Sequence, residues 1–159
     1  MITPFLCAIV LAQNPTPATT PPANPLGDKL KASKLTYTDI GAFLQVTFGT
    51  DGGKRKQTTY VRKQAETYLS LEANEVFSLV WESSKEPTPE FLIEVFQKRY
   101  KLGGLVYEVP SGTQTMYRIR YSINAYTSTT SDALRYLLDV AASTGDSLEK
   151  ILSPTEDKL

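Results

Sequence analysis

The sequence predicts an α+β domain in which a five-stranded antiparallel sheet combines with three helices, in the order α-β-β-β-α-β-β-α. Segments that alternate apolar and polar residues occur in two groups, first three and then two, as expected of half-buried strands. A segment with an apolar stripe at helical spacing separates the groups, and a longer one follows the second group. Glycine-containing turns between neighbouring strands favour antiparallel hairpins.

The chain divides into a leader, a linker, a domain and a tail. Its 159 residues suit one domain with extensions. We expect a signal peptide at 1–12, a proline-rich linker at 13–25, a folded domain at 26–153 and a tail at 154–159. Proline fixes φ and lacks a backbone donor, so the linker should be extended.

Residues 1–12 are apolar and carry no charged side chain. They are too few to span a bilayer, which takes roughly 20 apolar residues, and they match the apolar part of a secretory signal. The small-residue pattern that ends at Ala12 predicts cleavage before Gln13, and therefore a protein exported to the periplasm or the extracellular space. The absence of a basic residue before the apolar run disagrees with this. The alternatives are an apolar tail or a strand that docks on the domain.

The first half of the domain should hold one short helix and three strands. Leu26 and Leu30 lie four apart in the helix, which covers residues 26–34. Asp51-Gly52-Gly53 has the glycines that a hairpin turn requires. The strands expected on either side of this turn and after it are residues 36–48, with a bulge or bend at Gly41, residues 57–66 and residues 75–83.

The second half should hold two helices and two strands. Thr88 is suited to cap a helix that has Pro89 at its first position and ends before Gly103-Gly104. The last helix opens at Ser131-Asp132 and ends at Pro154, and Gly145 weakens its middle by about 1 kcal/mol relative to alanine. The two strands between these helices are residues 105–109 and 115–126.

The composition removes most catalytic chemistry. The chain has no histidine and one cysteine, so it has no imidazole for acid–base work, no internal disulfide and no cysteine-rich metal site. Lys and Arg (17) balance Asp and Glu (17), which gives no general attraction to nucleic acid. We therefore expect no enzyme, no cofactor, no metal and no nucleic-acid partner. The basic run Lys54-Arg55-Lys56 is expected to be a solvated turn.

One surface is a candidate for binding a partner. Strand alternation turns Tyr117, Ile119, Tyr121 and Ile123 toward the helices and leaves Arg118 and Arg120 on the opposite face. Tyr60 and Arg62 share a face for the same reason. Arginine hydrogen bonds and tyrosine contact area suit an extended acidic or aromatic segment, although a merely solvated sheet face is the alternative. The candidate partner-binding residues, with Trp81 as either an aromatic anchor or a core residue, are Tyr60, Arg62, Trp81, Arg118 and Arg120.

Features in a fixed order support a resemblance that covers about residues 26–152. They are Lys34-Leu35-Thr36-Tyr37, the Phe48-Gly49-Thr50-Asp51-Gly52 hairpin with Gln57-Thr58-Thr59-Tyr60-Val61, Val80-Trp81-Glu82-Ser83, the Phe91-Leu92 helix, and a closing helix with Asp132-Ala133-Leu134 and Gly145-Asp146-Ser147-Leu148-Glu149. The chain resembles the type III secretion chaperone-like superfamily, in particular its YbjN-type members. The resemblance implies a compact α+β domain that binds protein segments or has a regulatory role, without enzyme activity. The chain departs from the family in its expected export. It also departs in Glu94-Val95-Phe96-Gln97-Lys98, a stretch in which family members often have an asparagine.

Two functions remain open. The preferred one is a chaperone-like or adaptor domain that binds a protein or peptide in the cell envelope or outside the cell. The alternative is an envelope sensing module with a small-molecule pocket. A continuous exposed groove favours the first, and an enclosed cavity with convergent polar groups favours the second. The apolar columns of the middle helix, together with the resemblance, also suggest a homodimer through residues 89–102.

Overall fold

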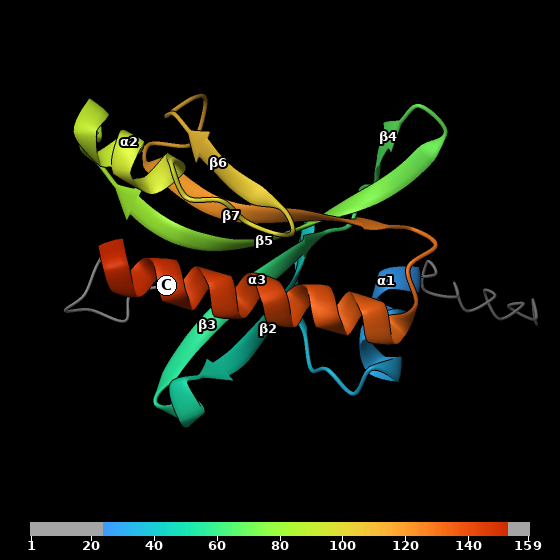
Figure 1. Cartoon of the computed structure of the whole chain (residues 1–159). Helices are drawn as coiled ribbons and strands as arrows, with labels where there is room; N and C mark the ends of the chain where they lie inside the picture. The colour runs from blue at the N-terminus through green and yellow to red at the C-terminus, as the bar shows by residue number, and fades with distance from the viewer. Residues whose placement is uncertain (1–23, 153–159) are drawn as a thin grey trace, which may run out of the picture.

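The computed structural model describes residues 24–152. The predicted signal peptide at 1–12, the cleavage site between Ala12 and Gln13, the linker up to residue 23 and the tail at 154–159 lie outside the described residues. The chain forms an α+β fold with three α-helices and one antiparallel sheet (Figure 1). Its elements are α1 (Pro25–Ala32), β1 (Thr38–Ile40), β2 (Phe43–Thr50), η1 (Asp51–Gly53), β3 (Arg55–Arg62), β4 (Glu66–Tyr68), β5 (Leu71–Ser83), α2 (Pro89–Phe96), β6 (Gly104–Glu108), β7 (Tyr117–Tyr126) and α3 (Ser131–Leu152).

The sheet has seven strands, so the prediction of five is wrong. Six of them follow the order β1-β2-β3-β5-β7-β6, and β4 pairs with the start of β5. Gly41 adopts a φ of 75°, which allows a tight turn, and β1 folds back on β2 where a bend in one continuous strand was expected. The predicted strand 57–66 likewise ends at Arg62, and a separate short strand follows it.

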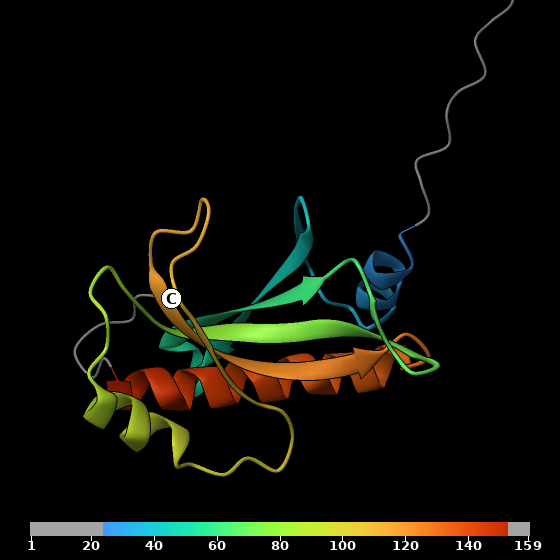
Figure 2. The same cartoon turned by 90° about the horizontal axis from the view of Figure 1, so that it is seen from above.

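Helix α3 covers one face of the sheet, α1 packs against α3 at one end, and β3, β5 and β7 are open on the other face. Figure 2 shows α3 running along one face, while the β1–β2 turn and the β6–β7 loop project away from it on the opposite side. The side chains on the helix-covered face form the core, and they alternate along each strand as the sequence predicts. The buried residues of the central strands are Leu44, Val46, Val61, Val76, Val80, Ile119, Tyr121 and Ile123.

Gly145 lets α3 approach the sheet closely. A Cβ at this position would lie 2.6 Å from the Ser78 hydroxyl oxygen and 3.1 Å from Gln57 Nε2. Ser78 and Gln57 are fully buried and hydrogen-bonded to each other, at 2.8 Å. Gly145 therefore weakens the helix, as the sequence predicts, but it also permits a close contact between α3 and the sheet. The sequence does not show this contact.

The middle helix is shorter than predicted. Thr88 caps it as expected, but α2 ends at Phe96 and not near Leu102. Tyr100 packs on Tyr121 with 5.2 Å between ring centroids, and the Tyr121 hydroxyl donates a hydrogen bond to the Leu102 carbonyl. These contacts hold the chain after α2 on the core, where it leads into β6 and cannot continue as a helix.

A β-bulge in β5 divides the strand into two parts. The pairing with β7 shifts between Leu79, which lies opposite Arg120, and Trp81, which lies opposite Ile119. Because the bulge adds one residue, Trp81 shares the face of the buried Ile119 and not that of Leu79. Its ring packs against Phe91 of α2, with centroids 5.1 Å apart.

Candidate functional site

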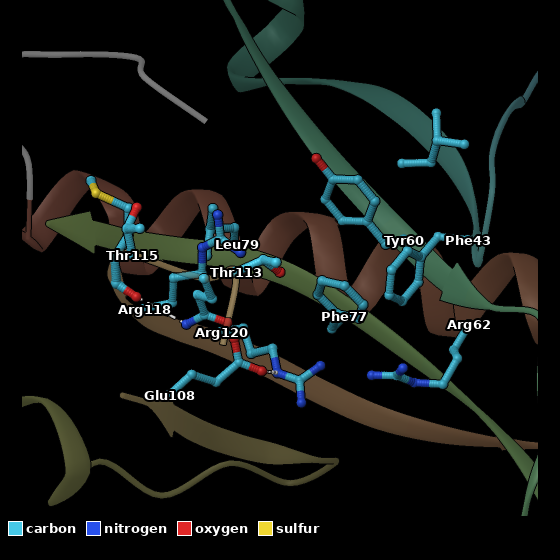
Figure 3. A pocket seen from close by; sticks show the side chains of 13 residues that line it. Phe43, Tyr60, Arg62, Phe77, Leu79, Glu108, Thr113, Thr115, Arg118 and Arg120 are labelled. Atoms are coloured by element: carbon cyan, nitrogen blue, oxygen red, sulfur yellow. Dashed lines mark hydrogen bonds and ion pairs between the residues drawn. The ribbon is translucent and has the colours of Figure 1, made fainter. Parts of the chain in front are cut away.

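The open face of the sheet contains a hollow of about 610 Å³, which we call the trough. Strands β3, β5 and β7 form its floor, and the two projecting loops flank it (Figures 2 and 3). Ile40 and Phe43 line one side, and residues 113–116 of the β6–β7 loop line the other. The remaining lining residues are Tyr60, Arg62, Phe77, Leu79, Glu108, Arg118 and Arg120.

Three aromatic rings lie together in the trough, Tyr60 and Phe77 on its floor and Phe43 at its side. Tyr60 stacks on Phe77 with 5.1 Å between centroids, and Phe43 meets Phe77 edge-on at 5.5 Å. The rings are half-buried, so they keep contact area for a ligand. Burial raises the pKa of Tyr60 above its ordinary value of 10.0.

Three arginines and three glutamates surround these rings. Arg62 and Arg120 both contact Glu75, at 3.1 and 2.8 Å, and their guanidiniums lie over the rings of Phe43 and Phe77. Two further ion pairs, Arg120 with Glu108 at 2.9 Å and Arg118 with Glu82 at 2.5 Å, continue the series toward the β6 side. The positive charge of the predicted patch is therefore balanced within the same face.

The arginines hold Glu75 in its charged form. Burial by itself raises the pKa of Glu75. The Ser122 hydroxyl donates a hydrogen bond to Oε1 at 2.7 Å, and together with the two guanidiniums it outweighs the burial. The pKa of Glu75 consequently lies below its ordinary value of 4.5.

The structure brings together four of the five predicted partner-binding residues. Tyr60, Arg62, Arg118 and Arg120 all line the trough, as strand alternation predicted for their faces. Trp81 does not, because the bulge in β5 turns it toward α2. The role of these five residues in binding a partner stays a prediction.

Sequence reasoning missed Phe77 and Leu79, which line the trough, and Glu75, which pairs with two of its arginines. These three residues occupy alternate positions of β5 and so share one face, a signal that was available in the sequence. Phe43 and Glu108 lie beside this face because of the order of the strands in the sheet. The local sequence pattern does not reveal that order.

The basic run at the β2–β3 hairpin is not uniformly solvated, contrary to the prediction. Arg55 lies 2.7 Å from Asp146 and 3.2 Å from Glu149, both on α3, and the Glu149 side chain is fully buried. Lys54 is exposed, as expected. The cluster ties the hairpin to the last helix and is structural, since it lies on the helix-covered side.

Two further searches concern the described residues alone. Residues 24–152 contain no group of three metal-ligating side chains that could hold an ion. No helix in that same range combines the length and the hydrophobicity needed to cross a membrane.

Comparisons with known proteins add no relative. No protein-family model matches the chain, and neither the curated proteins nor the solved structures gave a match.

Proposed function

We propose that the protein binds an extended segment of another polypeptide in the trough, and that it acts as a chaperone-like or adaptor domain without enzyme activity. The observation that carries this proposal is a sheet face left uncovered by helices, with three adjacent half-buried aromatic rings between two flanking loops. Aromatic side chains with exposed edges supply much of the binding energy at protein interfaces.

The shape of the trough favours a peptide over a small molecule. A small-molecule site is an enclosed cavity that takes up most of its ligand's surface. The trough is an open hollow across β3, β5 and β7, and each of its arginines contacts a glutamate of the same face. A sensing module with a small-molecule pocket is therefore the second candidate.

The ion pairs also define the ligand. Because Glu75, Glu82 and Glu108 neutralise the three arginines, a strongly acidic segment gains little from this face. We propose a ligand that is mainly neutral, with apolar or aromatic side chains for Tyr60 and Phe77. Of the acidic or aromatic segments expected from the sequence, this proposal keeps the aromatic ones and excludes the strongly acidic ones.

The proposed setting is the cell envelope or the extracellular space, and it depends on the apolar leader at residues 1–12. The resemblance to the type III secretion chaperone-like superfamily, YbjN-type, agrees with a domain that binds protein segments and with the α+β fold. N-terminal sequencing of the protein from its native host tests the setting. A mature N-terminus at Gln13 supports export, and an intact Met1 on cytosolic protein contradicts it.

Selection of peptides from a random phage-displayed library tests the binding proposal. Selected sequences should carry apolar or aromatic residues and bind the purified protein at micromolar concentration in calorimetry. Tyr60→Ser should weaken binding at least tenfold, because it removes the ring that stacks on Phe77.

A matched control is Tyr136→Ser, which removes a mostly exposed tyrosine from α3 on the opposite side of the sheet. This variant should bind with unchanged affinity. If both variants bind alike, or if selection yields no peptide whose binding depends on Tyr60, the trough is not a peptide site.

We also propose that the protein forms a homodimer through the α2 region, residues 89–102. Ile93 and Phe96 are 66% and 41% exposed, and with Leu92 and Tyr107 they surround an apolar hollow of about 320 Å³. In an antiparallel pair of α2 helices, Glu90 and Glu94 of one copy would lie near Lys98 and Arg99 of the other. None of these four charged residues forms an ion pair within residues 24–152.

A further inference from the structure

We propose that the segment bound in the trough also contacts the tip of the β4–β5 hairpin, so that the preferred ligand is a two-point extended peptide. It would carry two apolar residues six positions apart and one acidic residue between them. This inference rests on the proposed function of the trough and specifies its ligand.

The tip of the hairpin exposes an apolar surface, which we call the tip patch. Its residues are Tyr68 (52% exposed), Leu69 (103%), Leu71 (54%) and Tyr126 (49%). Large exposed apolar groups that lie together are typical of interaction sites. In Figure 1 the hairpin projects from the end of the sheet, where no helix covers it.

The strand register places the tip patch on the same face as the trough. Tyr68 lies opposite Leu71, and Ala73 lies opposite Tyr126, and residues paired in this way share a face. Leu71, Ala73, Glu75, Phe77 and Leu79 then follow one another at alternate positions of β5. The tip patch and the trough therefore lie toward the two ends of one face of β5, with the buried Ala73 between them.

Leu69 is an independent sign of function at the tip. Its φ is +57°, a left-handed conformation that glycine or asparagine adopts readily and that a bulky residue seldom does. The turn thus has a strained backbone and a fully exposed apolar side chain at the same residue. Glycine or asparagine at this position would avoid the strain and the exposed apolar surface. Strain of this kind concentrates at functional sites, and an apolar contact with a partner accounts for the choice of leucine.

The charges between the two ends favour an acidic residue in the ligand. Arg62 and Arg120 converge on the single carboxylate of Glu75. The Arg62 side chain remains 32% exposed, whereas that of Glu75 is 14% exposed. The free edge of the Arg62 guanidinium can donate to one ligand carboxylate, and Arg120 is satisfied on its other side by Glu108.

The spacing in the ligand follows from β5. Leu71 and Phe77 lie six residues apart, and Glu75 lies four residues from Leu71. At about 3.3 Å per residue the two apolar contacts are roughly 20 Å apart. An extended peptide has the same rise, so its own matching residues are also six apart, with the acid four positions from the residue at the tip.

Short synthetic peptides of serine and threonine test this spacing by calorimetry with the purified protein. Each carries two phenylalanines six positions apart and one aspartate, four positions after the first or four before the second, because the direction of the bound chain is open. One of the two orders should bind at least tenfold more tightly than peptides that keep only one phenylalanine. It should also bind more tightly than the same peptide with lysine in place of aspartate. Equal affinity of one- and two-phenylalanine peptides overturns the proposal.

Variants of the protein separate this inference from the proposed function. The pair Leu69→Asn and Leu71→Ser should reduce the two-phenylalanine peptide to the affinity of the single-phenylalanine peptide, since asparagine preserves the turn. Tyr60→Ser should weaken both peptides. Binding that depends on Tyr60 but gains nothing from the second phenylalanine overturns the two-point ligand and leaves the trough as a peptide site. If no peptide binds in a way that depends on Tyr60, both proposals are overturned.

Two other occupants of the tip patch are outcomes of the same test. Light scattering in which the Leu69 and Leu71 substitutions convert a dimer into a monomer assigns the patch to a second copy of the chain. Loss of binding to phosphatidylcholine vesicles in the same variant assigns it to a membrane surface. Either result overturns the proposal.

Discussion

Arg120 and Glu75 meet on the open face of the sheet, with 2.8 Å between Nη1 of the arginine and Oε2 of the glutamate. Their side chains are 13% and 14% exposed, so both charges are largely removed from water. Arg120 contacts Glu108 as well, which places one guanidinium between two carboxylates from different strands. The pairing keeps the face neutral and holds the arginine over Phe77.

Replacement of Arg120 with leucine should lower the free energy of unfolding by about 1.5–3 kcal/mol, because Glu75 and Glu108 lose a charged hydrogen-bond partner. Urea denaturation measures the change. Lys85→Leu is the matched control, since Lys85 is exposed and forms no ion pair within the described residues; it should change stability by less than about 0.5 kcal/mol. Equal effects of the two substitutions would contradict the assignment.

Arg55 should be far more important for stability than its neighbour Lys54. Arg55→Met leaves the fully buried Glu149 and the nearly buried Asp146 without this cation, and breaking such a pair costs about 3–5 kcal/mol. Lys54→Met at the exposed neighbouring position should have almost no effect. Thermal unfolding of the two variants checks this, and a similar melting temperature for both is the adverse result.

Gly145→Ala should destabilise the protein although alanine is the better helix former. The gain in helix propensity is about 1 kcal/mol, while the new methyl group would lie 2.6 Å from the Ser78 hydroxyl oxygen. Overpacking of a well-filled core costs about 1–3 kcal/mol. The companion variant Gly145→Ala with Ser78→Gly should recover part of the loss, and a single variant more stable than the parent would show that the contact is not tight.

Acid should destabilise the fold through Glu75 and Asp146. Burial raises the pKa of both carboxyl groups, but their hydrogen bonds and the nearby cations outweigh it. The pKa of Glu75 therefore lies below its ordinary 4.5, and that of Asp146 lies below its ordinary 3.8. A carboxyl whose pKa is lower when folded stabilises the fold above its unfolded pKa, and this contribution disappears as the pH falls through the folded pKa. Stability should therefore fall as the pH drops below about 4.5. Denaturation from pH 7 to 3 should show a smaller decline in Glu75→Gln, and an identical slope would exclude Glu75 as a cause.

The proposed homodimer depends on the apolar hollow beside α2. Ile93→Glu should give a monomer in light scattering at high micromolar concentration, because it introduces a charge into the proposed contact. Tyr136→Glu, at an equally exposed position of α3, should leave the association unchanged. A parent protein that is itself monomeric at that concentration refutes the dimer.

The sequence predicts the class of fold and the faces of the strands, because both follow from local periodicity. Ile119 and Arg118 lie on opposite faces, as their neighbouring positions require. The number of strands was wrong because β1 and β4 have three residues each, too few for a visible alternation. Of the two roles left open for Trp81, packing against other residues is the one that the structure shows, because a bulge reverses the alternation within β5 and no residue type marks that bulge.

The candidate site was predicted in part. Tyr60 and Arg120 were identified from their own strands, but their neutralisation by Glu75 and Glu108 depends on which strands are adjacent. The role of Arg55 was missed for the same reason, since its acidic partners are 91 and 94 residues further along the chain. Long-range pairing is not contained in short-range pattern.

The most direct test of the central claim is a map of where a selected peptide lies. A photoreactive version of the peptide, crosslinked to the purified protein and analysed by mass spectrometry, reports the residues beside it. We predict crosslinks to the trough, at Ile40, Tyr60 and Met116, that disappear in the Tyr60→Ser variant. Crosslinks confined to α2 or α3 would show that the peptide binds the helix-covered side, and would contradict the account.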